Sequence, residues 1–130
     1  MTEHEILSEP TGKQLDAWVA EAVFGWVCIE GGPGGGGEIF WRTPDGKTLE
    51  ECDDLPAYST DIADAWEVVE RLRGERIYLM RLTNGTDVYG CWFGSGIHDL
   101  VYSELCDTAP LAICRAALLA KLRESERGKS

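Results

Sequence analysis

Arginines and tryptophans are the residues of this chain whose types and positions predict a binding surface. The arginines gather where a predicted helix ends and the next predicted strand begins, at positions 71, 73, 76 and 81. A guanidinium binds phosphate or carboxylate oxygens in a bidentate manner, and aromatic rings stack on bases and cations. We therefore predict a ligand-binding surface from three tryptophans and three arginines: Trp26, Trp41, Arg73, Arg76, Arg81 and Trp92.

Two simpler explanations compete with that prediction. The arginines have Glu67, Glu70 and Glu75 beside them, and a run of charges is usually a solvated, self-neutralised surface. Large aromatic side chains also dominate small cores, so the strand tryptophans could be core residues. Trp18 and Trp66 fall on predicted apolar helix faces, and both are expected in the core.

Cysteine and histidine would supply nucleophilic catalysis or metal binding. The five cysteines include no C-x-x-C pair, and His4 lies far from His98. A structural zinc site draws its ligands in close pairs, so no metal and no cofactor is expected. His98 comes near Cys91 if their strands pair, but no third group orients the two side chains. A small hydrolase using Cys91 and His98 is the weaker alternative to reduced cysteines in a cytoplasmic protein.

The glycine tract Gly31–Gly37 contains a formal G-x-G-x-x-G pattern. A dinucleotide fingerprint requires a helix after the glycines, whereas here a strand is predicted, and Glu38 would repel a phosphate. The tract is therefore predicted to be a hairpin loop, with its role left open. The acidic residues between 47 and 57 lack calcium-loop spacing and predict a solvated loop.

Three helices and five strands are predicted to position these side chains. The helices cover 12–24, 60–73 and 109–124, with Thr11 capping the first, Ser59 or Thr60 the second, and Pro110 in the first turn of the third. Gly25 and Gly74 end the first two helices. Apolar residues recur at helical spacing in the second helix: Ile62, Ala65, Trp66, Val69 and Leu72.

The strands are expected at residues 26–30, 38–42, 76–83, 86–93 and 97–104. Asn84-Gly85 predicts a two-residue type I′ turn, and tight turns between strands predict a largely antiparallel sheet. The order is α-β-β-α-β-β-β-α, an α+β chain. These patterns leave open whether helices cover one face of the sheet or both.

Length and charge bound the domain organisation and the partners. The 130 residues predict one domain at 11–124, with a flexible acidic segment at 1–10 and a flexible tail at 125–130. The formal net charge of −11 argues against direct binding to nucleic acid or anionic lipid, because both depend on Lys and Arg. No apolar run reaches the roughly 18 residues of a membrane span.

Two segments resemble a known family. Residues 58–72, YSTDIADAWEVVERL, resemble the S-T-D-I-A-x-A-W-E-V-V-E-x-L helix of the phage ABA sandwich domain family. Residues 107–118, DTAPLAICRAAL, are similar to its C-terminal helix, and Phe24-Gly25-Trp26 and the W-x-x-P-D-G turn at 41–46 are similar as well. The resemblance covers residues 13–122. It implies a phage or prophage origin and a three-layer α-β-α sandwich, but no catalytic residues; the Gly31–Gly37 tract departs from the pattern.

The leading hypothesis for function is a phage accessory protein that works by non-catalytic binding, with an anti-defence role. It would sequester a nucleotide immune signal, stacked on Trp and Tyr and held by Arg73, Arg76 or Arg81, or antagonise a host protein by imitating DNA with its charge. An assembly component of the virion that forms a homo-oligomer is the alternative, ahead of the hydrolase.

Overall fold

The structure is a computed structural model that describes residues 2–30, 39–42, 48–49, 56–73, 79–84, 88–94 and 100–128. Within these residues the chain forms four helices and six strands. In chain order they are α1 (Glu3–Ser8), α2 (Lys13–Ala22), β1 (Val27–Glu30), β2 (Ile39–Arg42), β3 (Thr48–Leu49), α3 (Ile62–Arg73), β4 (Leu79–Asn84), β5 (Tyr89–Gly94), β6 (Leu100–Tyr102) and α4 (Ala109–Gly128).

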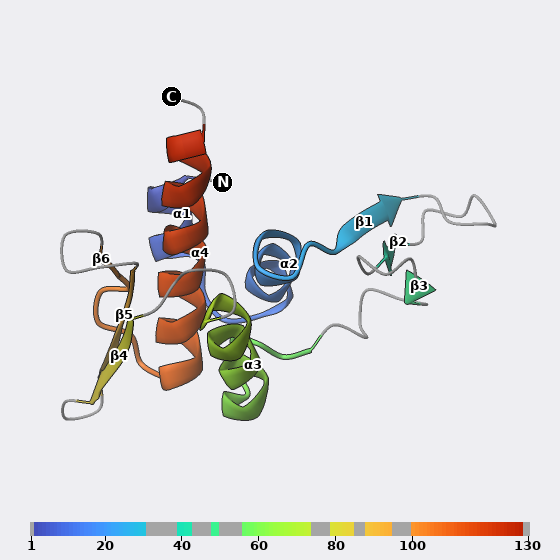
Figure 1. Ribbon diagram of the computed structural model, residues 1–130. Coiled ribbons are helices and arrows are strands. Elements are labelled where there is room, and N and C mark those ends of the chain that lie inside the picture. The colour runs from blue at the N-terminus through green and yellow to red at the C-terminus, as the bar shows by residue number, and fades with distance from the viewer. Residues whose placement is uncertain are drawn as a thin grey trace.

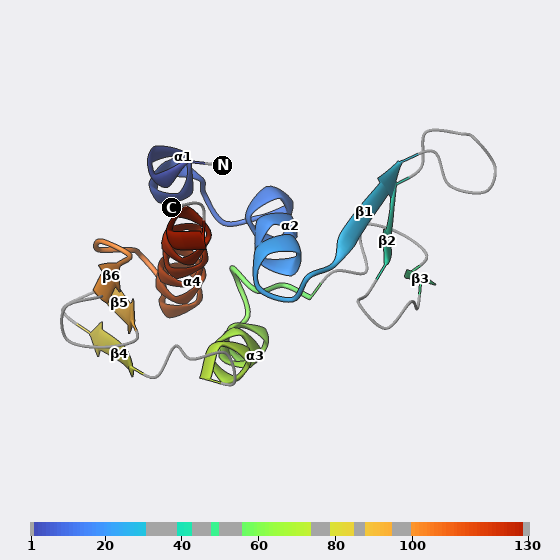
Figure 2. The same cartoon turned by 45° about the horizontal axis from the view of Figure 1, so that its top comes forward.

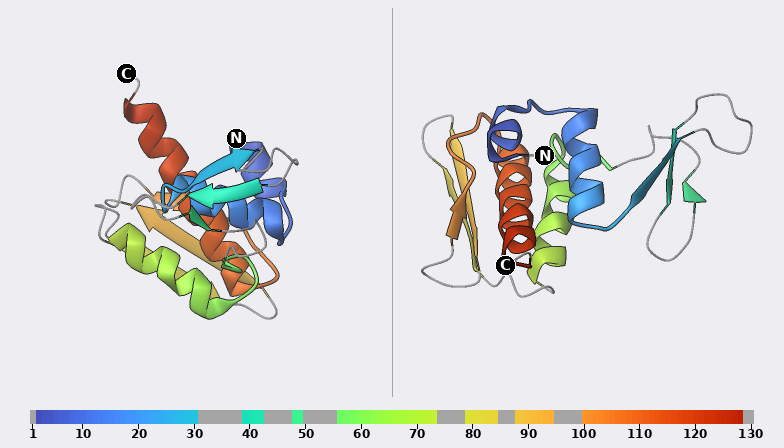
Figure 3. Two further views of the ribbon diagram at one scale, coloured as in Figure 1. Left: turned by 90° about the vertical axis from the view of Figure 1, so that its right-hand side faces the viewer. Right: turned by 90° about the horizontal axis from the view of Figure 1, so that it is seen from above.

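The strands form two antiparallel sheets of three strands, β1-β2-β3 and β4-β5-β6. Helix α4 lies between the second sheet and helices α2 and α3, and the first sheet lies beyond α2 (Figure 1 and Figure 3). The predicted α+β class and antiparallel pairing are confirmed. The prediction of one sheet of about five strands is wrong, because turn residues specify each hairpin locally but nothing local specifies which edge pairs with another hairpin.

Helix α4 forms the centre of the core. Its residues 111–114 and 116–120 are all buried, as expected of a helix that is apolar nearly all round. Seen nearly end-on in Figure 2, it has the β4-β5-β6 sheet on one side and the other helices around the rest. It begins as predicted, with Thr108 Oγ1 accepting from the Leu111 N–H at 3.4 Å. The tail expected to be flexible from 125 is helical to Gly128.

A fourth helix, α1, lies in the acidic segment that was expected to be flexible. Its N-terminus is closed by a capping box: the Thr2 hydroxyl accepts from the Glu5 N–H at 3.2 Å, and the Glu5 carboxylate accepts from the Thr2 N–H at 2.9 Å. Ile6 is fully buried against the core. The prediction of a flexible segment is therefore wrong for Glu3–Ser8, since six residues are too few to show an apolar period.

Helices α2 and α3 are joined at their first turns by a clasp of Gly12, Asp16 and Ser59. The Ser59 N–H donates to Asp16 Oδ1 at 2.7 Å, and the Gly12 N–H donates to Ser59 Oγ at 3.0 Å. Gly12, with a φ of +142°, is the N-cap of α2, so the prediction of Thr11 is wrong. Asp61 Oδ1 instead accepts from the first N–H groups of α3, because Ser59 is engaged in the clasp.

The other end of α2 follows the prediction. Gly25 has a φ of +73°, and the Trp26 N–H donates to the Ala20 carbonyl at 3.0 Å, which is the closing bond of a Schellman motif. The ring of Phe24 stacks on Tyr58 with centroids 5.1 Å apart. The segment that follows α2 and the segment that precedes α3 therefore lie next to each other.

The β4–β5 hairpin differs from its predicted turn. Asn84 pairs with Tyr89, so four residues separate the paired strands instead of the two of a type I′ turn. The observed register places Leu82 opposite Cys91 and Met80 opposite Phe93. A two-residue turn at Asn84-Gly85 would have set Leu82 opposite Asp87 instead of Cys91. Pairing with the buried Cys91 therefore favours the longer connection.

Candidate functional site

The six residues predicted to bind a ligand lie in several parts of the fold. Trp92 on β5 stacks on Tyr102 of β6, with centroids 4.1 Å apart and planes at 20°. In register, Arg81 lies opposite Trp92, and Trp92 lies opposite Tyr102. Sequence reasoning missed Tyr102, because its pairing with Trp92 depends on the register of two strands joined by a turn.

The other four predicted residues lie outside the row formed by Arg81, Trp92 and Tyr102. Trp26 is half-buried against the core at the start of β1, and Trp41 pairs with Cys28 in the first sheet. Arg73 is exposed at the end of α3, where its guanidinium bonds to the Glu70 carboxylate at 3.1 Å. Arg76 lies outside the described residues. The structure therefore places Arg81 and Trp92 at paired positions of adjacent strands and leaves Arg73 in the self-neutralised state that competed with ligand binding.

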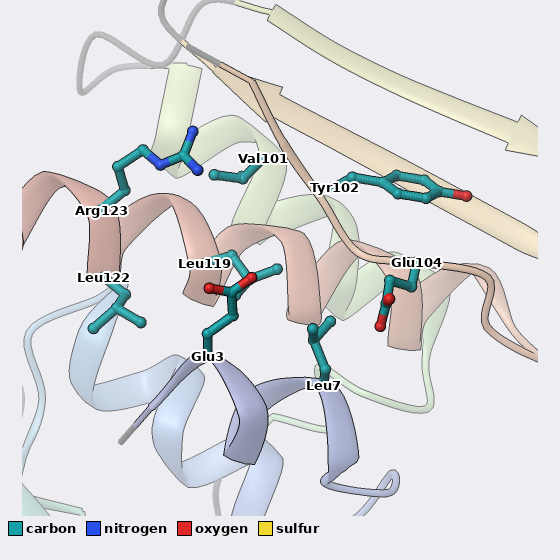
Figure 4. A pocket seen from close by; sticks show the side chains of 8 residues that line it. All are labelled: Glu3, Leu7, Val101, Tyr102, Glu104, Leu119, Leu122 and Arg123. Atoms are coloured by element: carbon teal, nitrogen blue, oxygen red, sulfur yellow. The ribbon is translucent and has the colours of Figure 1, made fainter.

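Beside Tyr102 lies a pocket of about 280 Å³ between α1, β6 and α4 (Figure 4). Its apolar lining comes from all three elements: Leu7, Val101, Leu119 and Leu122. Glu3, Glu104 and Arg123 supply the charges, so two carboxylates face one guanidinium. The pocket therefore combines apolar side chains with three charged ones, two of them negative.

Glu104 is held over this pocket by an unusual backbone conformation. Its φ of +63° lies in the left-handed region, which a non-glycine residue adopts at a cost of roughly 1 kcal/mol. The buried Ser103 hydroxyl accepts from the Cys91 N–H at 2.9 Å and donates to the Glu104 carbonyl at 2.8 Å. The same carbonyl also accepts from the Cys106 thiol at 3.5 Å. These bonds fix the backbone of the strained residue.

Two cysteine thiols of the core, those of Cys91 and Cys114, are poorly suited to nucleophilic catalysis. Cys91 is fully buried, and loss of solvation raises the pKa of its thiol to about 12, with a further contribution from nearby Cys106. Burial also raises the pKa of the Cys114 thiol, and the Asp16 carboxylate adds to that shift. A nucleophile must be a thiolate, so both thiols are inert near neutral pH. His98 lies outside the described residues.

Arg115 ties the N-terminal segment to α4. Its guanidinium donates to the Glu9 carbonyl at 2.8 Å and to the Cys106 sulfur at 3.6 Å, while Nε is buried without a partner in the described part of the chain. A second pocket, of about 360 Å³, adjoins it. These bonds link segments that are distant in sequence, which is a structural role.

The outer face of α3 is the most exposed apolar surface of the described helices. Ile62 is 51% exposed and Trp66 is 44% exposed, and their spacing of four residues places them on one face. Exposed carboxylates lie next to them along the helix, those of Asp61 and Glu67, and that of Glu70, which is bonded to Arg73. The predicted core position of Trp66 is wrong, because α3 buries Ala65, Val68, Val69 and Leu72 instead. Because Trp66 was assigned to the core, the sequence analysis did not predict the exposed face of Ile62 and Trp66.

Two classes of site are absent from the residues that the structure describes. No group of three or more His, Cys, Asp or Glu side chains is placed among them to hold a metal ion. None of their helices is both long and apolar enough to cross a membrane.

Comparison with known proteins gives one match. Residues 17–118 match the family model described as the phage ABA sandwich domain. This match includes both helical segments, 58–72 and 107–118, that carry the resemblance in the sequence. No curated protein and no solved structure matches the chain.

Proposed function

Because the chain belongs to the phage ABA sandwich domain family, we propose that it is a phage- or prophage-encoded accessory protein that binds a host protein without catalysis. The host cytoplasm is the compartment in which we expect it to act. The observation that carries the proposal is the outer face of α3, where Ile62 and Trp66 are exposed within a rim of carboxylates.

An exposed tryptophan on a rigid helix is a typical centre of a protein interface. Aromatic anchors supply much of the binding free energy of such interfaces, and surrounding polar residues exclude water. Trp66 has this arrangement, with Ile62 one turn before it and the exposed carboxylates of Asp61 and Glu67 adjacent to these two residues in sequence. A partner would bury these two apolar side chains without changing the fold of α3.

The rim selects the charge of the partner. Acidic residues around an apolar centre attract a basic surface and repel an acidic one. The whole chain carries −11, so a second copy of this chain would meet both local and long-range repulsion. A basic host protein, such as one that binds DNA, therefore fits this surface better than a homodimer does.

A nucleotide signal is the second candidate ligand, and one observation favours it. Arg81, Trp92 and Tyr102 occupy paired positions across the β4-β5-β6 sheet, which is an arrangement that could offer a ring and a guanidinium to one ligand. Against it, the Trp92 and Tyr102 rings already stack on each other, and the net charge repels phosphates. We therefore rank it second.

The test is the change in affinity caused by Trp66→Ala. Tagged wild-type protein would be used to capture and identify a basic partner from the host, and the affinity of the purified pair would then be measured by calorimetry. We expect Trp66→Ala to weaken binding by at least 10-fold, as hot-spot residues do. Leu105→Ala is the matched control, since Leu105 is also exposed, at 64%, but belongs to the segment between β6 and α4. Equal affinities of the two variants would refute the role of this face.

Native mass spectrometry of the protein purified from phage-infected cells separates the remaining outcomes. A non-covalent mass increment of nucleotide size would favour sequestration of a signal over binding of a host protein. A homo-oligomer of fixed size would favour an assembly role. A bound basic protein that dissociates as salt is raised would support the proposal.

A further inference from the structure

The pocket beside Tyr102 has an amphipathic lining that no part of the proposed function uses. Apolar side chains from α1, β6 and α4 line it, and so do two glutamates, Glu3 of α1 and Glu104 after β6 (Figure 4). It is separate from the α3 face, since α3 contributes no residue to it. We propose that this pocket binds a small compound carrying one ammonium group on a short aliphatic chain.

The two glutamates define the charge of the ligand. Within the described residues, neither the Glu3 nor the Glu104 side chain has a hydrogen-bonding or ion-pairing partner. An ammonium group donates three hydrogen bonds and has no acceptor, so it complements a pair of carboxylates. An anionic ligand would meet two negative charges and is excluded for the same reason.

The apolar lining defines the rest of the ligand. Leu7, Val101, Leu119 and Leu122 offer contact to methylene groups, whose removal from water favours binding. A volume near 280 Å³ admits a short chain and not a large ring system. An ammonium ion alone would forgo this contribution, so the aliphatic chain is part of the recognition.

Arg123 limits the ligand to one cationic group. Figure 4 shows Arg123 and Glu104 at opposite ends of the pocket, with Glu3 between them. A chain that places its ammonium group near Glu104 therefore directs its other end toward the guanidinium. A second ammonium group at that end would be repelled, so a monoamine should bind better than a diamine of the same length.

The position of Glu104 is set before any ligand binds. Ser103 and Cys106 hold its carbonyl in the strained conformation described above, so its backbone does not have to be ordered on binding. A residue that is already fixed loses less entropy when it contacts a ligand. We therefore expect Glu104 to contribute more to affinity than Glu3.

The probe for this pocket is n-pentylammonium chloride, titrated into the full chain and followed by calorimetry or ligand-observed NMR. We expect it to bind more tightly than 1-pentanol, pentanoate and cadaverine. Glu104→Gln and Glu3→Gln should weaken its binding roughly 3–10-fold. Glu21→Gln is the matched control, because it removes the same charge from an exposed residue of α2 outside the pocket.

Several results would overturn the proposal. Binding of pentanoate or 1-pentanol as tight as that of the amine would remove the role of the carboxylates. An equal loss of affinity in Glu21→Gln would show that only the overall negative charge attracts the amine. Tighter binding of cadaverine would contradict the limit to one ammonium group. Trp66→Ala should leave this binding unchanged, so failure here and failure of the proposed host-protein interface are distinguishable.

Discussion

Replacing Ser103 by alanine tests how the strained segment before α4 is held. Ser103 is fully buried, and its hydroxyl bridges two backbone groups, the Cys91 N–H of β5 at 2.9 Å and the Glu104 carbonyl after β6 at 2.8 Å. Alanine fills nearly the same volume and removes both bonds. The Glu104 carbonyl keeps the Cys106 thiol as a donor, but the Cys91 N–H loses the hydroxyl that accepts from it.

The magnitude follows from these two bonds. A buried donor left without a partner costs about 1–3 kcal/mol, and the lost bond to the Glu104 carbonyl adds about 0.5–1.5 kcal/mol. We therefore expect Ser103→Ala to lower the free energy of unfolding by about 2–4 kcal/mol. In a domain of this length that corresponds to a fall in Tm of roughly 10 °C.

The assay is urea or thermal unfolding followed by circular dichroism, with Ser8→Ala as the matched control. The Ser8 hydroxyl also donates to a backbone carbonyl, that of His4 at 2.6 Å, but it is exposed and water replaces the bond. We expect the control to change the free energy of unfolding by less than about 0.5 kcal/mol. If the two variants lose equal stability, the Ser103 bridge does not hold this segment.

Two further predictions concern Glu104 and Cys91. Glu104→Gly should raise the free energy of unfolding by about 1 kcal/mol in a urea titration while weakening n-pentylammonium binding, because glycine adopts a positive φ without strain; an equal gain in Glu104→Ala would contradict this. The folded pKa of Cys91 is raised from 9.0 to about 12, so its contribution to stability is complete below about pH 9 and is lost as the pH rises toward 12. The unfolding midpoint measured between about pH 8 and 11 should fall less steeply in Cys91→Ala, and parallel profiles would refute the shift.

Local signals in the sequence correctly predicted the end of α2 and the start of α4. Gly25 ends α2 because its positive φ allows the Schellman bond, and the D-T-A-P segment starts α4 because Pro110 needs no hydrogen-bonding partner in a first turn. Both signals act within a few residues. They depend little on where the rest of the chain lies, which is why they could be read correctly.

Helix orientation was harder to predict. In α3, Ile62, Ala65, Trp66 and Val69 fit an apolar face, and so do Ala65, Val68, Val69 and Leu72. The two faces overlap, and packing against α4 decides between them. Periodicity alone cannot rank the two, so Trp66 was assigned to the core while it is exposed.

The candidate pocket depended on contacts that the sequence does not encode locally. Trp92 was identified, but its neighbour Tyr102 required the register between β5 and β6. Glu3 required a short helix whose only sequence signal is the Thr2–Glu5 capping box. Glu104 required a positive φ, and a glutamate in the sequence gives no signal of that conformation.

The clasp of Gly12, Asp16 and Ser59 has a consequence for chain length. The segment between α2 and α3 carries β1, β2 and β3 and lies beyond α2 (Figure 3). The clasp and the stacked rings of Phe24 and Tyr58 hold the two ends of this segment close together. A segment whose two ends are held together can gain or lose residues at a small cost in free energy, since doubling a loop adds only about 0.6 kcal/mol of closure entropy. The helices and the β4-β5-β6 sheet can therefore keep one architecture while the segment between α2 and α3 varies in length. The seven-residue tract Gly31–Gly37 lies in this segment.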